Sequence, residues 1–105
     1  MSTPIPDTAL QLRSLIRSNG ELELSLASVP VPVPGPEEVL VRLEATPINP
    51  SDLGLLFGAA DMSTAVQSGT RDRPIVTARV PDAQMRGMKG RLDEPMPVGN
   101  EGAGV

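Results

Sequence analysis

The sequence predicts a mainly β protein with two or three short helices. Apolar and polar residues alternate over residues 21–26, as they do in a strand that buries one face. The dipeptide Asn19-Gly20, typical of a tight hairpin turn, comes just before this segment. Twelve prolines and ten glycines among 105 residues favour short strands joined by many loops.

The first two strands are predicted to form a hairpin. Residues 1–8 lack an apolar pattern, so we expect a flexible tail. Over residues 9–18, Leu10, Leu12 and Ile16 share one parity, which indicates a strand with one buried face. Both residues of Asn19-Gly20 tolerate positive φ, so the predicted connection to the second strand is a type I′ turn.

The tract from Val29 to Pro36 alternates valine with proline and ends in Pro-Gly-Pro. Each proline fixes φ and removes a backbone donor, so the tract is predicted to be extended and outside the middle of a sheet. One interpretation is a polyproline-II ligand for an SH3 or WW partner. The other is a stiff connector between strands, which the scarcity of flanking basic residues favours.

A third strand and a short helix are predicted next. Pro47 and Pro50 end the strand, because the residue before a proline is pushed out of the α region. Ser51 or Asp52 can then cap a helix that ends at Gly58. The strand, expected to be antiparallel, is indicated by four apolar residues of one parity, Val39, Val41, Leu43 and Ala45.

Residues 58–97 are predicted to be a helical and loop section. Two helical turns are expected over residues 61–67, and a strand over residues 74–80. Proline at position 81 suits the first turn of a further helix. On that helix Met85, Met88 and Leu92 fall on one face, either as gap-filling core or as a binding surface.

Composition excludes several classes of function. The net charge is −4, basic residues are not clustered and only one residue is aromatic, so nucleic acid is not an expected partner. The sequence has no cysteine or histidine, which excludes disulfides and thiolate catalysis and removes the commonest metal ligand. It also has no run of about twenty apolar residues and no signal-peptide pattern, so we expect no membrane association and a cytoplasmic location.

Few side chains can carry acid–base or nucleophilic chemistry. Ser51 and Asp52 lack a neighbouring base, which argues against a catalytic triad. The glycines of residues 99–104 are spaced differently from a G-x-G-x-x-G dinucleotide fingerprint and follow prolines. We therefore interpret this segment as a tight backbone passage into a strand, where larger side chains would not fit.

Two segments resemble one family. Residues 34–52, Pro-Gly-Pro-Glu-Glu-Val-Leu-Val-Arg-Leu-Glu-Ala-Thr-Pro-Ile-Asn-Pro-Ser-Asp, resemble the N-terminal strand and following loop of medium-chain dehydrogenases/reductases. Residues 98–105, Val-Gly-Asn-Glu-Gly-Ala-Gly-Val, resemble their Gly-His-Glu-Gly-Ala-Gly-Val segment. The resemblance implies that residues 9–105 form an incomplete GroES-like β-barrel, with an inserted section near residues 58–97. It also implies that the chain stops before the nucleotide-binding Rossmann domain.

Differences from the family place the chain on its zinc-free side. Zinc-dependent alcohol dehydrogenases have a cysteine near the position of Asn49 and a histidine where Asn100 stands, so zinc is not expected. The pattern is similar to quinone oxidoreductases and enoyl reductases, although the tyrosine proton donor of enoyl reductases is missing. The resemblance implies that Asn49 lies near nicotinamide and substrate, that Ser51 and Asp52 shape its loop, and that Asn100 and Glu101 occupy the former zinc-site position.

The resemblance implies a zinc-independent, NAD(P)H-dependent oxidoreductase that reduces a quinone, an activated alkene or a carbonyl. The small-molecule substrate and NAD(P)H would bind the full-length protein, a homo-oligomer, and this segment alone would be inactive and bind no cofactor. The alternative is a non-enzymatic interaction module that uses the Val29–Pro36 proline tract or the helix face of Met85 and Met88. We also expect an unpaired edge at the last strand and a tendency to self-associate.

Overall fold

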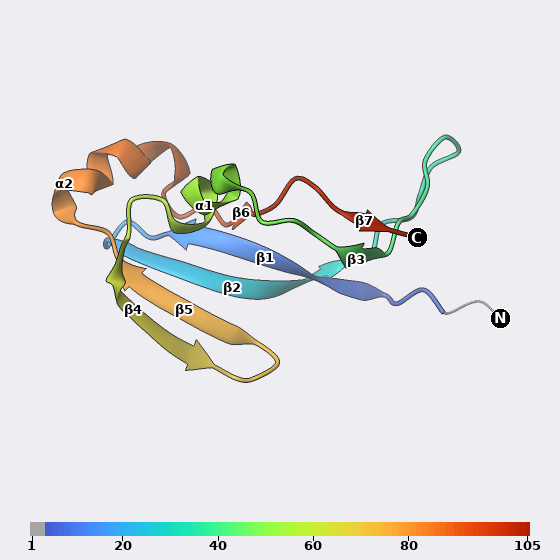
Figure 1. Cartoon of the computed structure of the whole chain (residues 1–105), viewed down its shortest axis with the longest axis horizontal. Helices are drawn as coiled ribbons and strands as arrows, with labels where there is room; N and C mark the ends of the chain where they lie inside the picture. Colours follow the sequence, from blue (N-terminus) through green and yellow to red (C-terminus); the bar gives the residue numbers. More distant parts are fainter. Residues whose placement is uncertain (1–3) are drawn as a thin grey trace.

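A computed structural model of the chain describes residues 4–105 and is mainly β, with short helices (Figure 1). The helices are α1 (Pro50–Phe57), α2 (Asp82–Met85) and the 3-10 helix η1 (Arg86–Arg91). The strands are β1 (Thr8–Ile16), β2 (Glu21–Pro30), β3 (Leu43–Ala45), β4 (Asp61–Gly69), β5 (Pro74–Arg79), β6 (Met96–Pro97) and β7 (Ala103–Gly104). They form a five-stranded sheet in the order β4-β5-β2-β1-β6 and a two-stranded sheet of β3 and β7.

The predicted hairpin is confirmed, but its turn differs from the prediction. All nine residues of β1 pair antiparallel with β2, from Thr8 opposite Pro30 to Ile16 opposite Leu22. Gly20 has a φ of 88°, whereas Asn19 has no positive φ, so the turn is not type I′. The Gly20 N–H instead donates to the Arg17 carbonyl at 3.0 Å, and the glycine alone takes the left-handed conformation.

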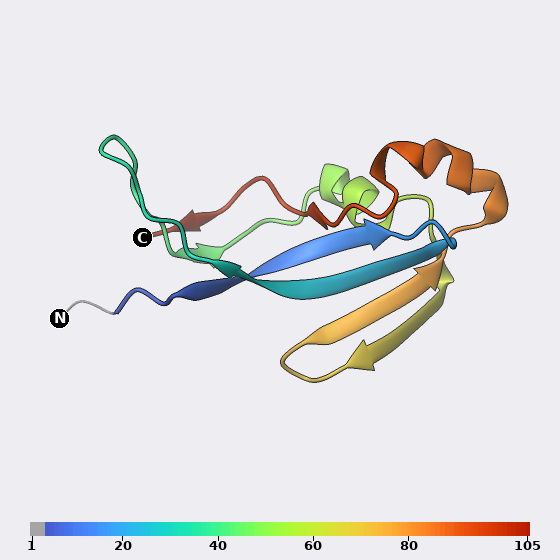
Figure 2. The same ribbon diagram turned by 180° about the vertical axis from the view of Figure 1, so that it is seen from behind.

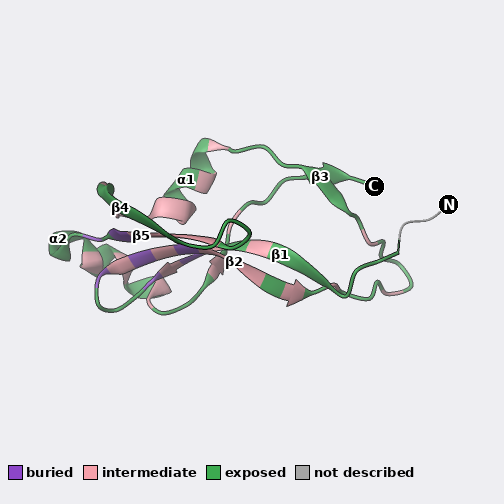
Figure 3. Cartoon of the chain, turned by 90° about the horizontal axis from the view of Figure 1, so that it is seen from below, coloured by how far each residue is buried: buried purple, intermediate pink, exposed green. Residues whose placement is uncertain are grey.

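The core lies at the turn end of this hairpin. In Figure 3 the buried residues gather at the end of the sheet near α2. At the other end of the same face of β1, Leu10 is 51% exposed and Leu12 is 38% exposed. The radius of gyration of 16.1 Å exceeds the roughly 13 Å of a compact domain of this size. The difference arises because the end of the molecule that contains β3 and β7 is loosely packed. The core consists of Ile16, Leu22, Leu24, Ala78 and Val80.

The prediction of two helical turns over residues 61–67 was wrong, because these residues lie in β4. Val66 pairs with Thr77 and Gly69 with Pro74, so β4 and β5 form a hairpin of their own. Residues 61–67 have no strong apolar period, and antiparallel pairing with β5 decides their conformation. The strand predicted over residues 74–80 is confirmed as β5.

The helix predicted from Pro81 forms only in part. One α-helical turn, α2, is followed by the 3-10 turns of η1, and Pro81 precedes α2 instead of lying in its first turn. Met85, Met88 and Leu92 are half-buried and pack against the core. The gap-filling interpretation of these methionines is therefore the one the structure supports.

The segment between β2 and α1 is mostly irregular. β3 is shorter than the predicted strand: it covers residues 43–45 only, and Val39 is 84% exposed. Within the proline tract, Pro30 ends β2 and Val33 is 91% exposed. Of the predicted flexible tail, residues 1–3 lie outside the described residues, and Thr8 already belongs to β1.

Candidate functional site

Pairing of β3 with β7 brings together two loops that are far apart in the sequence. Leu43 lies opposite Gly104 and Ala45 opposite Ala103, in antiparallel register. The N–H of Arg42 donates to the carbonyl of Val105 at 2.7 Å, which extends the pairing by one residue. β3 leads into the loop before α1, and β7 follows the glycine-rich loop, so the two loops lie side by side (Figure 2).

Glycine permits the close approach of these two strands. A Cβ atom at Gly104 would overlap the carbonyl oxygen of Arg42. A Cβ atom at Gly102 would lie 2.6 Å from Cδ2 of Leu43, which is closer than side chains pack. The interpretation as a tight backbone passage into a strand is confirmed for Gly102 and Gly104, whereas a Cβ atom at Gly99 would meet no atom within 4 Å.

One hydrogen bond joins the two loops through side chains. Asn49 Nδ2 donates to Glu101 Oε1 at 3.2 Å, although the two residues are 52 positions apart. Asn49 is half-buried, whereas Glu101 and its neighbour Asn100 are exposed. Of the residues singled out in the sequence, the structure thus brings Asn49 and Glu101 into direct contact.

The start of α1 holds Asn49 in place. Asn49, rather than Ser51 or Asp52 as predicted, is the residue that precedes the first helical turn, with Pro50 at the first helical position. The carboxylate of Asp52 accepts from the backbone N–H of Asn49 at 2.9 Å. This bond fixes the backbone of Asn49, and its side-chain amide extends to Glu101. Ser51 is exposed on the first turn of the helix.

The chemistry available at these loops is hydrogen bonding. The Asn49 amide can both donate and accept, and Glu101 supplies an acceptor. Within residues 4–105, no three side chains of the His, Cys, Asp and Glu types converge on a common point. The loops can therefore orient a carbonyl or amide group.

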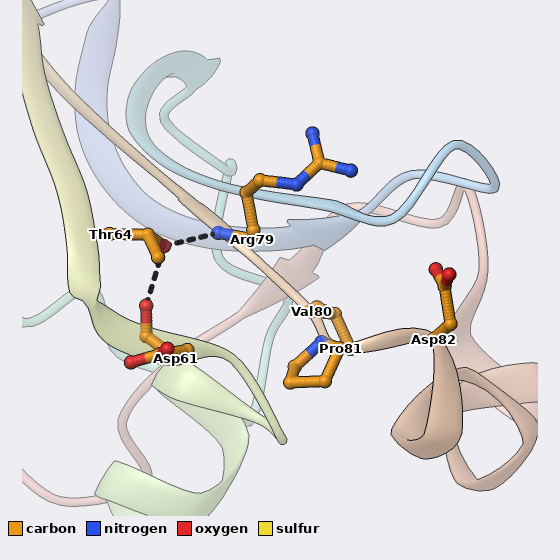
Figure 4. Close-up of a pocket in the computed structure, with 6 residues that line it drawn as sticks. All are labelled: Asp61, Thr64, Arg79, Val80, Pro81 and Asp82. Carbon is orange, nitrogen blue, oxygen red and sulfur yellow. Dashed lines mark hydrogen bonds between the residues drawn. The ribbon is translucent and has the colours of Figure 1, made fainter.

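A second feature, missed in the sequence because a helix was predicted there, is a hollow of about 280 Å³ between β4 and the start of α2 (Figure 4). The Thr64 hydroxyl donates to the carbonyl of Asp61 at 2.6 Å and accepts from the Arg79 N–H at 2.8 Å. The hydroxyl and backbone N–H of Ser63 lower the pKa of the Asp61 carboxyl. These hydrogen bonds stabilise an irregular part of β4. The Thr64 hydroxyl and the Arg79 N–H at the hollow therefore already have partners within the protein. Its lining comprises Asp61, Thr64, Arg79, Val80, Pro81 and Asp82.

A buried polar cluster was also not foreseen. The Ser14 hydroxyl donates to the carbonyl of Leu56 at 2.7 Å and accepts from an Arg91 guanidinium N–H at 2.8 Å. Burial lowers the pKa of Arg91, and its Nε is buried without a hydrogen-bond partner. The cluster ties β1 to α1 and η1.

No family model matches the sequence, and no curated protein matches it significantly. No helix among residues 4–105 has both the length and the apolar character needed to cross a bilayer.

Proposed function

We propose that this chain is the substrate-side, GroES-like part of a zinc-independent medium-chain reductase, which uses NAD(P)H to reduce a quinone, an activated alkene or a carbonyl. The hydrogen bond between Asn49 and Glu101 is the observation that carries the proposal. These residues belong to the two segments that resemble the family, and their contact across β3 and β7 is what a shared site requires. The proposed family rests on the resemblance of residues 34–52 and 98–105.

In this proposal the Asn49 amide faces the nicotinamide and the substrate. Asp52 fixes the backbone of Asn49, and Ser51 shapes the outer side of the loop. Asn100 and Glu101 take the place of the zinc site, with Glu101 orienting Asn49 through its carboxylate. Bound NAD(P)H supplies the hydride, and these residues supply orientation.

The residues present fit only the nicotinamide part of the cofactor. An amide such as that of Asn49 can pair with a carboxamide, which donates and accepts hydrogen bonds, or with a carbonyl group, which accepts them. The glycine-rich loop of residues 99–104 lies against β3, where Gly104 lies against the Arg42 backbone. We propose that dinucleotide binding belongs to a Rossmann domain of a longer, cytoplasmic, homo-oligomeric protein.

The test is an assay of the protein expressed from its whole reading frame. We expect oxidation of NADPH or NADH in the presence of a naphthoquinone or an α,β-unsaturated ketone. Asn49→Ala should lower kcat at least about tenfold, the usual scale for loss of a positioning contact. Asn19→Ala, an exposed asparagine in the hairpin turn, is the matched control and should leave kcat unchanged.

Two results would contradict the proposal. One is a reading frame without a dinucleotide fingerprint and without nicotinamide-dependent reduction of either acceptor. The other is micromolar binding of NADPH to residues 1–105 alone, measured by calorimetry, since the proposal assigns cofactor binding to a separate domain.

The competing function is a non-enzymatic interaction module. Met85 and Met88 pack against the core, so the proline tract is the remaining contact surface of this hypothesis. Its tip at Val33 is exposed, while part of the tract lines a hollow of about 270 Å³ with Ile5, Pro6 and Asp7. A peptide spanning Val29 to Pro36 that binds an SH3 or WW domain would favour this function.

A further inference from the structure

α1 is attached to the sheet by its last turn. Leu56 and Phe57 pack against the core, whereas Ser51 on the first turn is exposed. The helix lies over β1 (Figure 1), and the hydroxyl of Ser14 on that strand donates to the Leu56 carbonyl at 2.7 Å. The last carbonyls of a helix lack partners within it, and Ser14 supplies one. This buried hydroxyl therefore fixes the C-terminal end of α1 on β1.

Arg91, at the end of η1, reinforces this attachment. Its Nη2 donates to the Ser14 hydroxyl at 2.8 Å. Its Nη1 lies beside Gly58, the residue that ends α1, at 3.5 Å from where a Cβ atom of that glycine would stand. α1 has no basic residue in its own last turn, and a cation at this end interacts favourably with the helix dipole. Arg91 thus supplies, from a distant segment, the positive charge that the end of the helix lacks.

Stability alone does not explain an arginine at position 91. Its Nε is buried without a hydrogen-bond partner, and within residues 4–105 no carboxylate forms an ion pair with it. Burial accordingly lowers the pKa of Arg91. A partly buried charge without a carboxylate partner is unfavourable, and an apolar side chain often stabilises such a position equally well or better. The arginine is therefore better explained by the geometry that it imposes on α1.

The other end of α1 lies at the candidate site. Asn49 precedes the first turn of the helix and donates to Glu101 at 3.2 Å. A helix of this length spans about 12 Å and moves as a rigid unit, so a change at its last turn also displaces its first. A hydrogen bond of 3.2 Å is at the long end of the usual range. A shift of the first turn by about 0.5 Å away from Glu101 would therefore break it.

We propose that Ser14 and Arg91 are positioning residues for the candidate site: they fix how α1 lies on β1, and the helix carries this position to the Asn49 amide. The structural coupling depends only on the contacts described above. Its effect on catalysis rests on the proposed reductase function, in which Asn49 orients the nicotinamide and the substrate. A residue that only stabilises the fold would leave Asn49 unchanged in the folded protein, whereas a positioning residue would not.

NMR of the side-chain amides tests this coupling in the full chain. Asparagine-selective isotope labelling gives few signals, because the asparagines of the sequence are Asn19, Asn49 and Asn100. Glu101→Ala removes the acceptor and so marks where the Asn49 signals lie when the hydrogen bond is broken. Ser14→Ala and Arg91→Met should each move the Asn49 signals most of the way toward that position. Arg91→Lys keeps a cation that can donate to Ser14, and it should leave them close to their wild-type position.

Matched controls are Ser28→Ala on β2 and Arg86→Met on η1, both at exposed positions, and neither should move the Asn49 signals. Circular dichroism confirms that each variant is folded. Arg91→Met decides the matter if Ser14→Ala does not fold, because it keeps the buried hydroxyl and an apolar side chain. Asn49 signals that stay at their wild-type position in folded Arg91→Met, or that move equally in the controls, would overturn the proposal.

The catalytic consequence is measured in the protein expressed from its whole reading frame. Arg91→Met should lower kcat several-fold and leave KM unchanged, because Asn49 is misplaced while the substrate contacts remain. An unchanged kcat alongside shifted Asn49 signals would refute the catalytic role. A wild-type protein without reductase activity would refute the proposed function instead, and the NMR result would still decide the structural coupling.

Discussion

Ser14 shows how one side chain can hold several elements together. It lies on β1 with no exposed surface, in the inward parity of Ile16. Its hydroxyl bonds to the backbone of α1 and to Arg91 at the end of η1. A buried hydroxyl is tolerated only when it is hydrogen-bonded, and here it satisfies both partners at once.

Replacing Ser14 should therefore destabilise the chain more than its size suggests. Ser14→Ala leaves the Leu56 carbonyl and one Arg91 N–H without this partner, so we expect the free energy of unfolding to fall by about 1–3 kcal/mol. Urea denaturation measures the change. Ser28→Ala, an exposed serine on β2, should change it by less than about 0.5 kcal/mol. Equal effects of the two substitutions would argue against the buried cluster.

At the scale of elements, the hairpin of β1 and β2 depends on the backbone of Gly20. Its φ of 88° is rarely adopted by residues that have a Cβ atom. A Cβ atom there would lie 3.6 Å from the Val80 carbonyl, which is an ordinary contact. Any cost of substitution is therefore conformational rather than steric.

Gly20→Ala should lower the free energy of unfolding by about 1–2 kcal/mol, the cost of a left-handed residue that has a Cβ atom. Gly54→Ala is the matched control in α1, where an added Cβ atom meets no atom within 4 Å. Since alanine favours a helix over glycine, we expect this control to gain roughly 0.5–1 kcal/mol. Thermal or urea unfolding should thus show a lower free energy of unfolding for Gly20→Ala and a higher one for Gly54→Ala. A loss in both variants would contradict the conformational explanation.

At the scale of the whole molecule, packing is uneven. The helices and the hairpin turn lie at one end, and β3, β7 and the C-terminus lie at the other (Figure 1). β2 passes through both regions. Its residues 22–24 are paired on both sides, with β1 and β5, whereas its later residues pair with β1 alone. A two-stranded ribbon is marginally stable in water, so the open end should be the weaker part.

Hydrogen exchange along β2 should reveal this gradient within a single strand. We expect amides of Leu22 and Leu24 to exchange only by large-scale unfolding, and those of Ala27 and Val29, which face β1 at the open end, to exchange much faster by local opening. NMR-detected exchange of the monomer at low concentration measures it. Uniform protection along β2 would mean that the open end is as stable as the core.

The sequence by itself determined the mainly β class, the first hairpin, β5 and the inward faces of β1 and β2. These features depend on local alternation and on turn residues such as Gly20, which act over a few positions. Met85 and Met88 could also be interpreted as core residues, since a spacing of three positions places them on one face of a predicted helix.

Only the tertiary structure decided which distant segments meet. The conformation of residues 61–67 follows from pairing with β5, and local propensity gave the wrong prediction. The partners of Ser14 lie 42 and 77 positions away, at distances that no local pattern encodes. The contact of Asn49 with Glu101 likewise requires β3 and β7 to pair first. The candidate site is therefore a product of long-range strand pairing, whereas its individual residues could be chosen from the sequence.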